Sequence, residues 1–482
     1  MSSNEVTDHR NYQGHLTIRL WRPKAFCYRC LVSSHPLQNE EQGLRHQLSA
    51  GQMAMVAVGG SIGTGLLLGS AAAIELAGPA VIISFLLAAL INWTVAMALG
   101  ELSSMHPAAG SFGIYGELYL NAWAGFLARG GYWAAISVSI GAEMVASATY
   151  MSYWFPSVPG SVWVVVFSVA LLLINLLSVG KYGRFEFWFA MIKVVTIAAF
   201  VVLGSALLFS SRVSPQYTAH GGFFPNGVLA PLLAMTFAVY AFGGVEFVAV
   251  TSGESRSAAE VAKAVWRAFL ILTLVYLGAI AVLVGVMPWN RAGVSESPFV
   301  TVFRSVNLPG AGHVMNFVVL TAALSGANAA LYISSRMLFS LARSGWAPAA
   351  LGHLNSRGSP NRALLVSSYG IVVALVLEGW AAQHALEYIL RGAFFGMILS
   401  WVVSLAAHIS FRAHATKSEL EALPLRSPLG LWGSVVGLAL IVFTILKGWW
   451  DSRINLVSGV GYLILLSVAY WLLKTSRRNL AD

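Results

Sequence analysis

Charged residues are scarce in this chain of 482 residues: Asp, Glu, Lys and Arg together make up 10% of it. Soluble domains carry about 25%, so 29 Lys plus Arg and 19 Asp plus Glu are too few to cover a water-soluble globule of this length. Two cysteines and 46 glycines without a fixed period exclude a disulfide scaffold and a collagen-like fibre. With 57% hydrophobic residues and a mean hydropathy of +0.72, the composition predicts a polytopic membrane protein.

Residues that mark enzymes and metal sites are also few or badly spaced. Aspartate occurs only as Asp8, Asp451 and Asp482, none of them inside an apolar segment, and no His-Glu-x-x-His pattern is present. The 11 histidines have no metal-ligand spacing, and Cys27 and Cys30 form a lone Cys-x-x-Cys, which we interpret as incidental reduced thiols. We therefore expect no enzyme activity, no metal and no cofactor.

Long apolar segments succeed one another along the chain. They are unbroken and do not alternate, which excludes a β-barrel, and twelve helices of ~20 residues would use about half of the chain. Clusters containing Pro, Gly, Asn or charge separate them. Segments 124–154 and 312–341 exceed the length that a ~30 Å core requires, so we expect tilt or a cytoplasmic projection. The predicted spans are 51–73, 79–99, 124–154, 160–178, 187–209, 229–252, 265–287, 312–341, 363–380, 386–410, 430–448 and 454–473.

Basic residues are distributed unevenly between the two sides that these spans define. With the N-terminus inside, the inner segments hold 22 of the 29 Lys and Arg and the outer ones hold 6, while Lys193 lies within a span. The positive-inside rule therefore predicts that both termini are cytoplasmic. Residues 1–45, which lack the apolar core of a signal peptide, and residues 476–482 are the expected cytoplasmic tails, the first of them disordered. Because the basic residues stand singly between spans, no nucleic-acid partner is expected.

Glycines interrupt two of the predicted spans. The first span contains Gly59-Gly60-Ser61-Ile62-Gly63-Thr64-Gly65, four glycines in seven residues, each costing ~1 kcal/mol of helix propensity. The sixth contains Ala241-Phe242-Gly243-Gly244-Val245-Glu246. The interruptions are five spans apart, and an odd offset makes the two spans cross the bilayer in opposite directions. This pattern indicates inverted repeats that meet at a binding site near the bilayer midplane.

An interrupted helix exposes main-chain N–H groups at the start of one half and C=O groups at the end of the other. The amides attract a carboxylate and the carbonyls an ammonium, so the pair of breaks predicts a site for an α-amino acid. The alternative is that the small residues let helices pack closely, as in GxxxG interfaces. A dinucleotide site is excluded because no strand precedes the glycines. The predicted substrate-binding residues are Gly60, Ser61, Ile62, Gly63, Thr64, Gly65, Glu143, Tyr240, Phe242 and Gly243.

At these residues the chain resembles the bacterial amino-acid permeases of the amino acid–polyamine–organocation superfamily, the branch with the GABA, asparagine, phenylalanine and lysine permeases. The resemblance covers roughly residues 43–475. Its motifs include Gly59 to Gly65, Gly100-Glu101-Leu102, Pro107 to Phe112, Glu186-Phe187-Trp188-Phe189 to Lys193, Phe242 to Glu246, and Asn316 to Ser325.

The resemblance implies an all-α transmembrane domain over residues 46–475, with a five-plus-five inverted repeat and two extra helices. Repeat one would span about 51–209, repeat two about 229–410, and the extra helices about 430–473. It also implies amino-acid uptake that is usually driven by protons. One segment departs from the family: where relatives have a proline-containing inner linker, this chain reads Arg256 to Lys263 without proline. The geometry of that linker is left open.

Ionisable residues inside a membrane are costly and suggest function by default. Lys193 either snorkels to the headgroups or, as the resemblance implies for proton-coupled members, gains and loses a proton during transport. Glu246, next to the second break, either carries a proton or satisfies freed amides. Glu143, in the third span, either ties helices together or, as an acid that faces the cavity, senses the substrate amine or carries a proton.

Gating is the expected role of a further set of residues. Glu101, at the inner end of the second span, is a structural or gating residue, and Glu254 and Arg336 either pair in an inner gate or form a solvated face. Tyr240 and Phe242 flank the second break, where an aromatic ring either closes over the substrate or simply packs.

Together these features predict a secondary transporter that imports an amino acid by proton symport with alternating access. We expect a monomer in the bacterial inner membrane. The alternatives are an exchanger or facilitator without proton coupling, and a sensor that binds an amino acid without transporting it. Side-chain selectivity would depend on cavity walls from the third, sixth, eighth and tenth spans, which the sequence does not rank.

Overall fold

The computed structural model describes residues 48–108, 110–177, 182–210, 214–292, 297–305, 310–356, 358–381, 385–451 and 453–479. The predicted tail of residues 1–45, with Cys27 and Cys30, lies outside these described residues. Within them the chain is built from helices, and the strand-like pairing found there is a single isolated bridge between Leu48 and Ser255.

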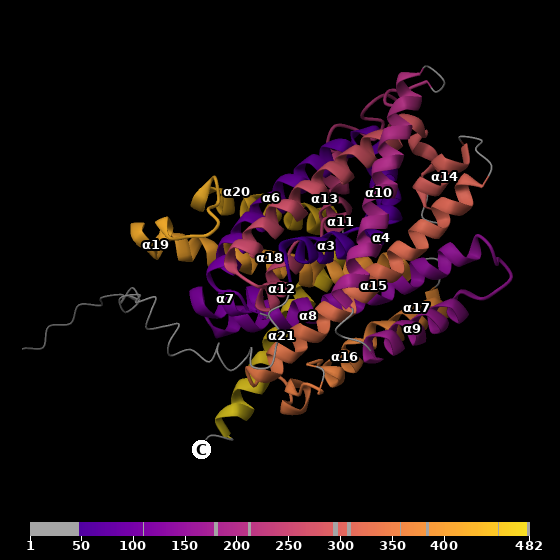
Figure 1. Cartoon of the computed structure of the whole chain (residues 1–482). Helices are drawn as coiled ribbons and strands as arrows, with labels where there is room; N and C mark the ends of the chain where they lie inside the picture. Colours follow the sequence, from indigo (N-terminus) through magenta and orange to yellow (C-terminus); the bar gives the residue numbers. More distant parts are fainter. Residues whose placement is uncertain are drawn as a thin grey trace, which may run out of the picture. The chain divides into compact units, whose positions relative to one another are not determined.

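The helices follow the predicted apolar segments closely (Figure 1). The first part of the chain contains α3 (Ala50–Ser61), α4 (Thr64–Leu67), α5 (Gly69–Ala77), α6 (Val81–Met105), α7 (Ser111–Tyr119), α8 (Ala122–Ser152), α9 (Gly160–Leu177) and α10 (Tyr182–Phe209). The middle part contains α11 (Ala230–Ala241), α12 (Phe247–Thr251), α13 (Ala258–Val286), α14 (Pro298–Ser305) and α15 (Ala311–Arg343). The last part contains α16 (Asn361–Ser367), α17 (Tyr369–Ala381), α18 (Ala385–His414), α19 (Lys417–Glu421), α20 (Gly430–Asp451) and α21 (Arg453–Asn479).

Helix length and hydropathy identify nine membrane-crossing stretches among the described residues, and the helices Gly160–Asn175 and Ala230–Ala241 are apolar but shorter. An all-helical, multi-pass membrane protein is therefore confirmed, while the number twelve stays a prediction. The first and sixth predicted spans do not reach full length because both are interrupted. The 31 residues of α8 and the 33 of α15 form continuous helices, about 47 and 50 Å long at 1.5 Å per residue.

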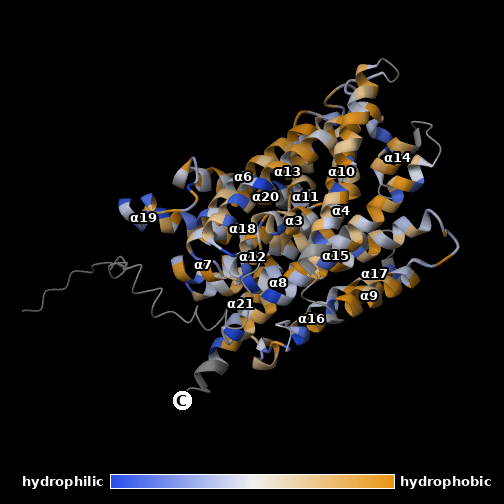
Figure 2. Cartoon of the chain, in the orientation of Figure 1, coloured by the Kyte–Doolittle hydropathy of each residue, from blue (hydrophilic) through white to orange (hydrophobic). Residues whose placement is uncertain are grey.

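Exposure follows the pattern of a protein surrounded by lipid. Large apolar side chains face outward, such as Val202 at 66%, Leu274 at 71% and Trp380 at 82% exposed, and Figure 2 shows hydrophobic residues along most helices. Charged side chains such as Arg129 and Lys193 are instead buried among the helices. A charge facing hydrocarbon is costly, so polar groups collect inside the helical bundle.

Two groups of helices surround the breaks. Long helix α8 packs against α15, α18, α17 and α9, while α13 packs against α6, α3 and α10. Helix α11 lies against α5 and α6. The interrupted helices thus contact two sets of helices, one around α8 and one around α13. The breaks therefore lie inside the protein.

The inner linker, Arg256 to Lys263, is built without a proline. Ser257 caps α13 by accepting a hydrogen bond from the Glu260 amide, so a serine N-cap starts the helix. Main-chain bonds join Leu48 to Glu254 and Arg256, and the Ala50 amide donates to the Glu260 carboxylate at 2.7 Å. The linker and the start of α3 are thereby joined.

Candidate functional site

Both predicted helix breaks are present. Helix α3 ends at Ser61 and α4 begins at Thr64, with Gly63 in an extended conformation at φ −135°. Helix α11 ends at Ala241 and α12 begins at Phe247. Each predicted interruption is thus present but shorter than expected, over Ile62-Gly63 within 59–65 and over Phe242 to Glu246 within 241–246.

The two breaks lie in direct contact. A Cβ atom added at Gly244 would lie 2.4 Å from Ser61 Oγ and 2.8 Å from its amide nitrogen, and the φ of Gly244, +116°, itself favours glycine. A Cβ at Gly65 would lie 3.0 Å from the Cα of Ala241. Glycine is therefore required here both for a left-handed turn and for the approach of one chain segment to the other.

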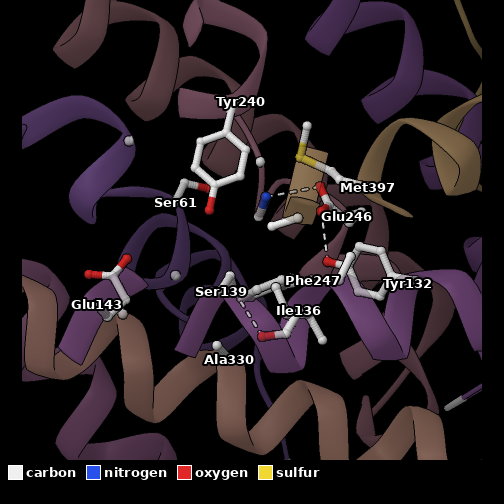
Figure 3. Close-up of a pocket in the computed structure, with 17 residues that line it drawn as sticks. Ser61, Tyr132, Ile136, Ser139, Glu143, Tyr240, Glu246, Phe247, Ala330 and Met397 are labelled. Carbon is white, nitrogen blue, oxygen red and sulfur yellow. Dashed lines mark hydrogen bonds between the residues drawn. The ribbon is translucent and has the colours of Figure 1, made fainter. Parts of the chain in front are cut away.

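A pocket opens where the breaks meet α8, α15 and α18 (Figure 3). Its walls come from the helices that correspond to the predicted third, sixth, eighth and tenth spans. The described residues that line it are Gly60, Ser61, Gly65, Tyr132, Ala135, Ile136, Ser139, Glu143, Tyr240, Gly243, Gly244, Glu246, Phe247, Gly326, Ala330, Ala393 and Met397.

The carboxylate of Glu143 caps the second half of the first broken helix. The Thr64 amide donates to its two oxygens at 3.2 and 3.3 Å, and the Thr64 hydroxyl donates to Oε1 at 3.2 Å. Two glycines make room for it, because a Cβ at Gly63 would lie 2.4 Å from Oε1 and one at Gly326 3.0 Å away. Glu143 therefore accepts hydrogen bonds from one of the freed main-chain amides, that of Thr64. The sequence suggested that such amides bind a substrate carboxylate.

Lys193 points into the protein and not toward the headgroups. Its ammonium donates to the Gly59 carbonyl at 2.6 Å, and the residue is 1% exposed. Glu186, which sequence reasoning did not select as a site residue, lies against Gly59 from the same helix α10: a Cβ there would lie 2.4 Å from Glu186 Oε1. The Ser325 hydroxyl donates to the same oxygen at 2.6 Å. A lysine and a glutamate of α10 thus both lie at the last turn of α3.

Another group that the sequence did not reveal is the Tyr276 hydroxyl. It donates to the Ser61 carbonyl at 2.6 Å from helix α13. Together with the bond from Lys193 to Gly59, this occupies two of the carbonyl groups that the first break frees. A tyrosine in an apolar helix carries no local signal for this role.

Glu246 satisfies main-chain and side-chain donors beside the second break. The Tyr132 hydroxyl donates to Oε1 at 2.7 Å, and the Gly244 amide donates to Oε2 at 3.0 Å (Figure 3). The residue is 1% exposed. The geometry matches the structural alternative, the capping of freed amides, and the proton-carrying role stays a prediction.

The predicted aromatic pair is divided. Tyr240 lines the pocket, whereas Phe242 lies outside the lining, fully buried, with its ring centre 4.8 Å from that of Tyr276 and 6.3 Å from that of Phe85. Of the other predicted substrate-binding residues, Ile62, Gly63 and Thr64 do not line the pocket either. Gly63 and Thr64 affect the pocket indirectly, because Gly63 leaves room for the Glu143 carboxylate and Thr64 donates to it.

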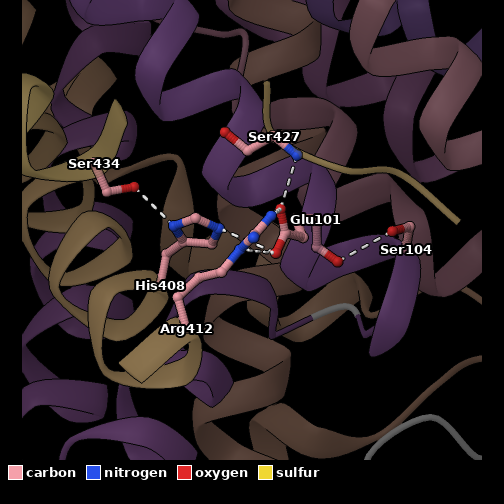
Figure 4. Close-up of polar contacts among 6 residues, drawn as sticks. All are labelled: Glu101, Ser104, His408, Arg412, Ser427 and Ser434. Carbon is pink, nitrogen blue, oxygen red and sulfur yellow. Dashed lines mark hydrogen bonds and ion pairs between the residues drawn. The ribbon is translucent and has the colours of Figure 1, made fainter. Parts of the chain in front are cut away.

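Glu101 and its partners join three segments (Figure 4). Arg412 of α18 donates to both Glu101 oxygens at 2.6 Å, and the Ser427 amide donates at 2.9 Å. His408 Nε2 lies 3.4 Å from Oε1. Glu101 is completely buried, away from the pocket lining, so this cluster connects α6, α18 and the segment before α20.

Glu254 and Arg336 are placed together, as the sequence suggested. Arg336 Nε lies 3.3 Å from Glu254 Oε1, the Tyr332 hydroxyl donates to Oε2 at 2.7 Å, and the guanidinium stacks 3.4 Å above the Tyr332 ring. Arg336 is 4% exposed, so the alternative of a fully solvated face does not fit. The pair links the end of the second broken helix to α15.

No group of three or more His, Cys, Asp or Glu side chains suited to a metal ion occurs among the described residues. The lining combines carboxylates, hydroxyls and main-chain groups of two helix breaks, which suits a small zwitterion. Comparison with known proteins decides the family: the amino acid permease model matches residues 52–473. The chain belongs to this family.

Similar proteins cover this permease almost from end to end. An uncharacterised amino acid permease of Bacillus subtilis (strain 168), YtnA, is 35% identical over 446 residues, which are 90% of this chain and 96% of the relative. The aromatic amino acid transport protein AroP of Escherichia coli (strain K12) is 34% identical, over 85% of this chain and 91% of its own. The gamma-aminobutyric acid permease of Bacillus subtilis (strain 168) is also 34% identical, over 81% and 85%. The resemblance to bacterial permeases of the amino acid–polyamine–organocation superfamily is thereby confirmed, and with it a multi-pass membrane protein of an amino acid transport family.

Proposed function

We propose that this permease imports an amino acid together with a proton, by alternating access, and holds its substrate between the two helix breaks. The observation that carries the proposal is the pocket itself, which both breaks line together with α8, α15 and α18. Irregular backbone inside a membrane protein is tolerated where it lines a cavity. The substrate's α-carboxylate would take amides of the first break and the Tyr240 hydroxyl, and its ammonium would face Glu143 or Glu246.

Lys193 supports the coupling to protons. As an ammonium it binds the Gly59 carbonyl at 2.6 Å, at the last turn of α3. Loss of a proton removes the charge from this hydrogen bond, and charge-assisted bonds are roughly twice as strong as neutral ones. The end of α3 would then be held less firmly, so protonation would be linked to the arrangement of the first break.

Alternating access requires contacts at the inner face that form and separate. The Glu254–Arg336 pair and the Glu101–Arg412 pair are our candidates, because each joins segments far apart in the chain. We also propose twelve spans and the five-plus-five inverted repeat over residues 46–475, with both termini cytoplasmic and a monomer as the transporting unit. The support is the pair of breaks and the excess of basic residues in the inner segments.

Uptake into proteoliposomes tests the proposal. Each labelled amino acid would be offered with and without a pH gradient that is acidic outside, and the transported one competed with the other nineteen. We expect accumulation that depends on the gradient, and its loss in Lys193→Ala. The matched control is Lys263→Ala, since Lys263 is an exposed lysine paired with Glu260.

Other outcomes distinguish the alternatives. Exchange of internal for external amino acid without any effect of the gradient would favour an exchanger or facilitator. Binding without uptake would favour a sensor. Gradient-driven accumulation by Lys193→Ala would contradict the assignment of Lys193.

A further inference from the structure

The ionisable residues that line the pocket are glutamates and tyrosines. Glu143 lies against the first break and Glu246 against the second (Figure 3), and both are less than 10% exposed. No Lys, Arg or His is among the described residues of the lining. Lys193 reaches the first break from outside the pocket, where its ammonium binds the Gly59 carbonyl. Every ionisable group that a substrate meets in this lining is therefore an acid, and none is a base.

The hydroxyl groups in the lining add to this asymmetry. Three of the four already donate their hydrogen within the protein, so toward a ligand their oxygens can only accept. The fourth, that of Tyr240, makes no hydrogen bond within the described part of the chain. The committed donors are Ser61, Ser139 and Tyr132, whose acceptors are the Ala57 carbonyl at 2.8 Å, the Ile136 carbonyl at 2.8 Å and Glu246 at 2.7 Å.

Main-chain donors of the second break are committed as well. The Gly243 amide donates to the Tyr240 carbonyl at 2.9 Å, and the Gly244 amide donates to Glu246 at 3.0 Å. Hydrogen-bond donors for a ligand thus remain near Tyr240 and the adjacent first break. These donors are enough for one carboxylate, the α-carboxylate that all α-amino acids share.

We propose that this pocket takes α-amino acids with neutral or cationic side chains and excludes those whose side chain is a carboxylate. The inference rests on the proposed function, because it names the substrate class of the same site. With the α-carboxylate placed at Tyr240, a second carboxylate would lie against acceptor oxygens and the carboxyl groups of Glu143 and Glu246, with no cation of the described lining to pair with it. A buried carboxylate without a hydrogen-bond donor or a cation is strongly unfavourable, and specificity often comes from leaving the wrong ligand unpaired.

The test uses ligand pairs of equal shape and different charge. Purified wild-type protein at pH 7, in detergent without any gradient, would bind a labelled amino acid that it transports. The competitors are asparagine and aspartate, glutamine and glutamate, and 4-carbamoyl- and 4-carboxyphenylalanine, which cover three sizes of side chain. We expect each acid to compete more weakly than its amide, by at least about a hundredfold in the pair whose amide binds best.

Two variants show whether the glutamates are responsible. We expect Glu246→Gln or Glu143→Gln to reduce the discrimination between amide and acid by about tenfold or more, since each replaces a carboxyl group of the lining by an amide that can donate a hydrogen bond. Glu378→Gln is the matched control, because Glu378 lies on α17 outside the lining. It should retain the discrimination of the wild type.

Three results would count against the inference or its basis. An acid that competes as well as its amide would overturn the inference while leaving amino-acid transport intact. Discrimination that survives in both folded variants would overturn the role of the two glutamates. If none of the twenty amino acids binds or is transported, the proposed function itself fails.

Discussion

The carboxylate of Glu143 accepts hydrogen bonds from both the main-chain amide and the hydroxyl of Thr64, at 3.2 to 3.3 Å. Residues 79 positions apart thereby join α8 to the start of α4 beside the pocket. The site therefore holds a buried carboxyl group at the break even before a substrate arrives. The consequences can be tested at the glycines, tyrosines and ion pairs that keep this arrangement in place.

The position of Glu143 depends on Gly326. In Gly326→Ala the new methyl group would lie about 3.0 Å from the carboxylate carbon and Oε1, so the carboxylate must shift from Thr64. We expect substrate affinity to fall by about tenfold, the equivalent of one lost hydrogen bond of ~1.4 kcal/mol. Uptake kinetics measure this. Gly379→Ala on α17, where a Cβ meets nothing within 4 Å, is the control and should transport normally.

Gly244 combines backbone strain with a close contact. Gly244→Ala would cost about 1–2 kcal/mol for its left-handed conformation and more for the clash with Ser61. Gly310→Ala shares a positive φ, +76°, but meets open space, so it isolates the strain. Thermal unfolding of the purified variants should show a much larger loss for Gly244→Ala. Equal losses in the two variants would mean that the breaks do not interlock as described.

Tyr276 fixes the end of α3 at the first break. Removing its hydroxyl in Tyr276→Phe leaves the Ser61 carbonyl without this donor, and we expect a loss of about 1 kcal/mol of stability together with slower transport. Tyr217→Phe is the matched control, since the Tyr217 hydroxyl also donates to a main-chain carbonyl, that of Ala281 at 3.0 Å. Equal transport by both variants would argue against a role of Tyr276 at the break.

Arg412 holds a buried carboxylate. Arg412→Ala leaves Glu101 buried with its main counter-charge removed, for which we expect a loss of about 3–5 kcal/mol. Arg412→Lys keeps the charge but not the two-point contact, so its loss should be smaller. In the double variant Glu101→Gln/Arg412→Ala stability should partly recover, as judged by melting temperature. Additive losses would contradict a direct coupling of the two residues.

His106, just after the end of α6, should make stability depend on pH. Burial lowers the pKa of His106 from its usual value near 6.5 to about 4 in the folded protein, where its Nε2 contacts the Tyr119 hydroxyl at 2.7 Å. The folded state therefore binds fewer protons than the unfolded state between these values, so stability falls as the pH drops from about 6.5 to about 4. Melting temperatures of His106→Asn should decline less over this window than those of the wild type. A parallel decline would contradict the assignment.

The sequence predicts what depends on local composition. Glycine clusters revealed both breaks, and the long apolar segments revealed the helices around them. The partners of the breaks could not be predicted, because Tyr276 reaches Ser61 across 215 positions and Tyr132 reaches Glu246 across 114. Phe242 shows that a residue next to the break in the sequence need not line the pocket, because its ring packs against Phe85 and Tyr276.

The contact between the two breaks has an evolutionary consequence. Gly244 leaves space for Ser61, Gly60 leaves space for the Phe247 ring, and Gly65 leaves space for Ala241. Each segment thus fills space that glycines of the other segment leave open. In descendants of this permease, a larger side chain in one segment should be accompanied by a smaller one at the facing position of the other segment. Substitutions in the two segments are therefore expected to occur in pairs.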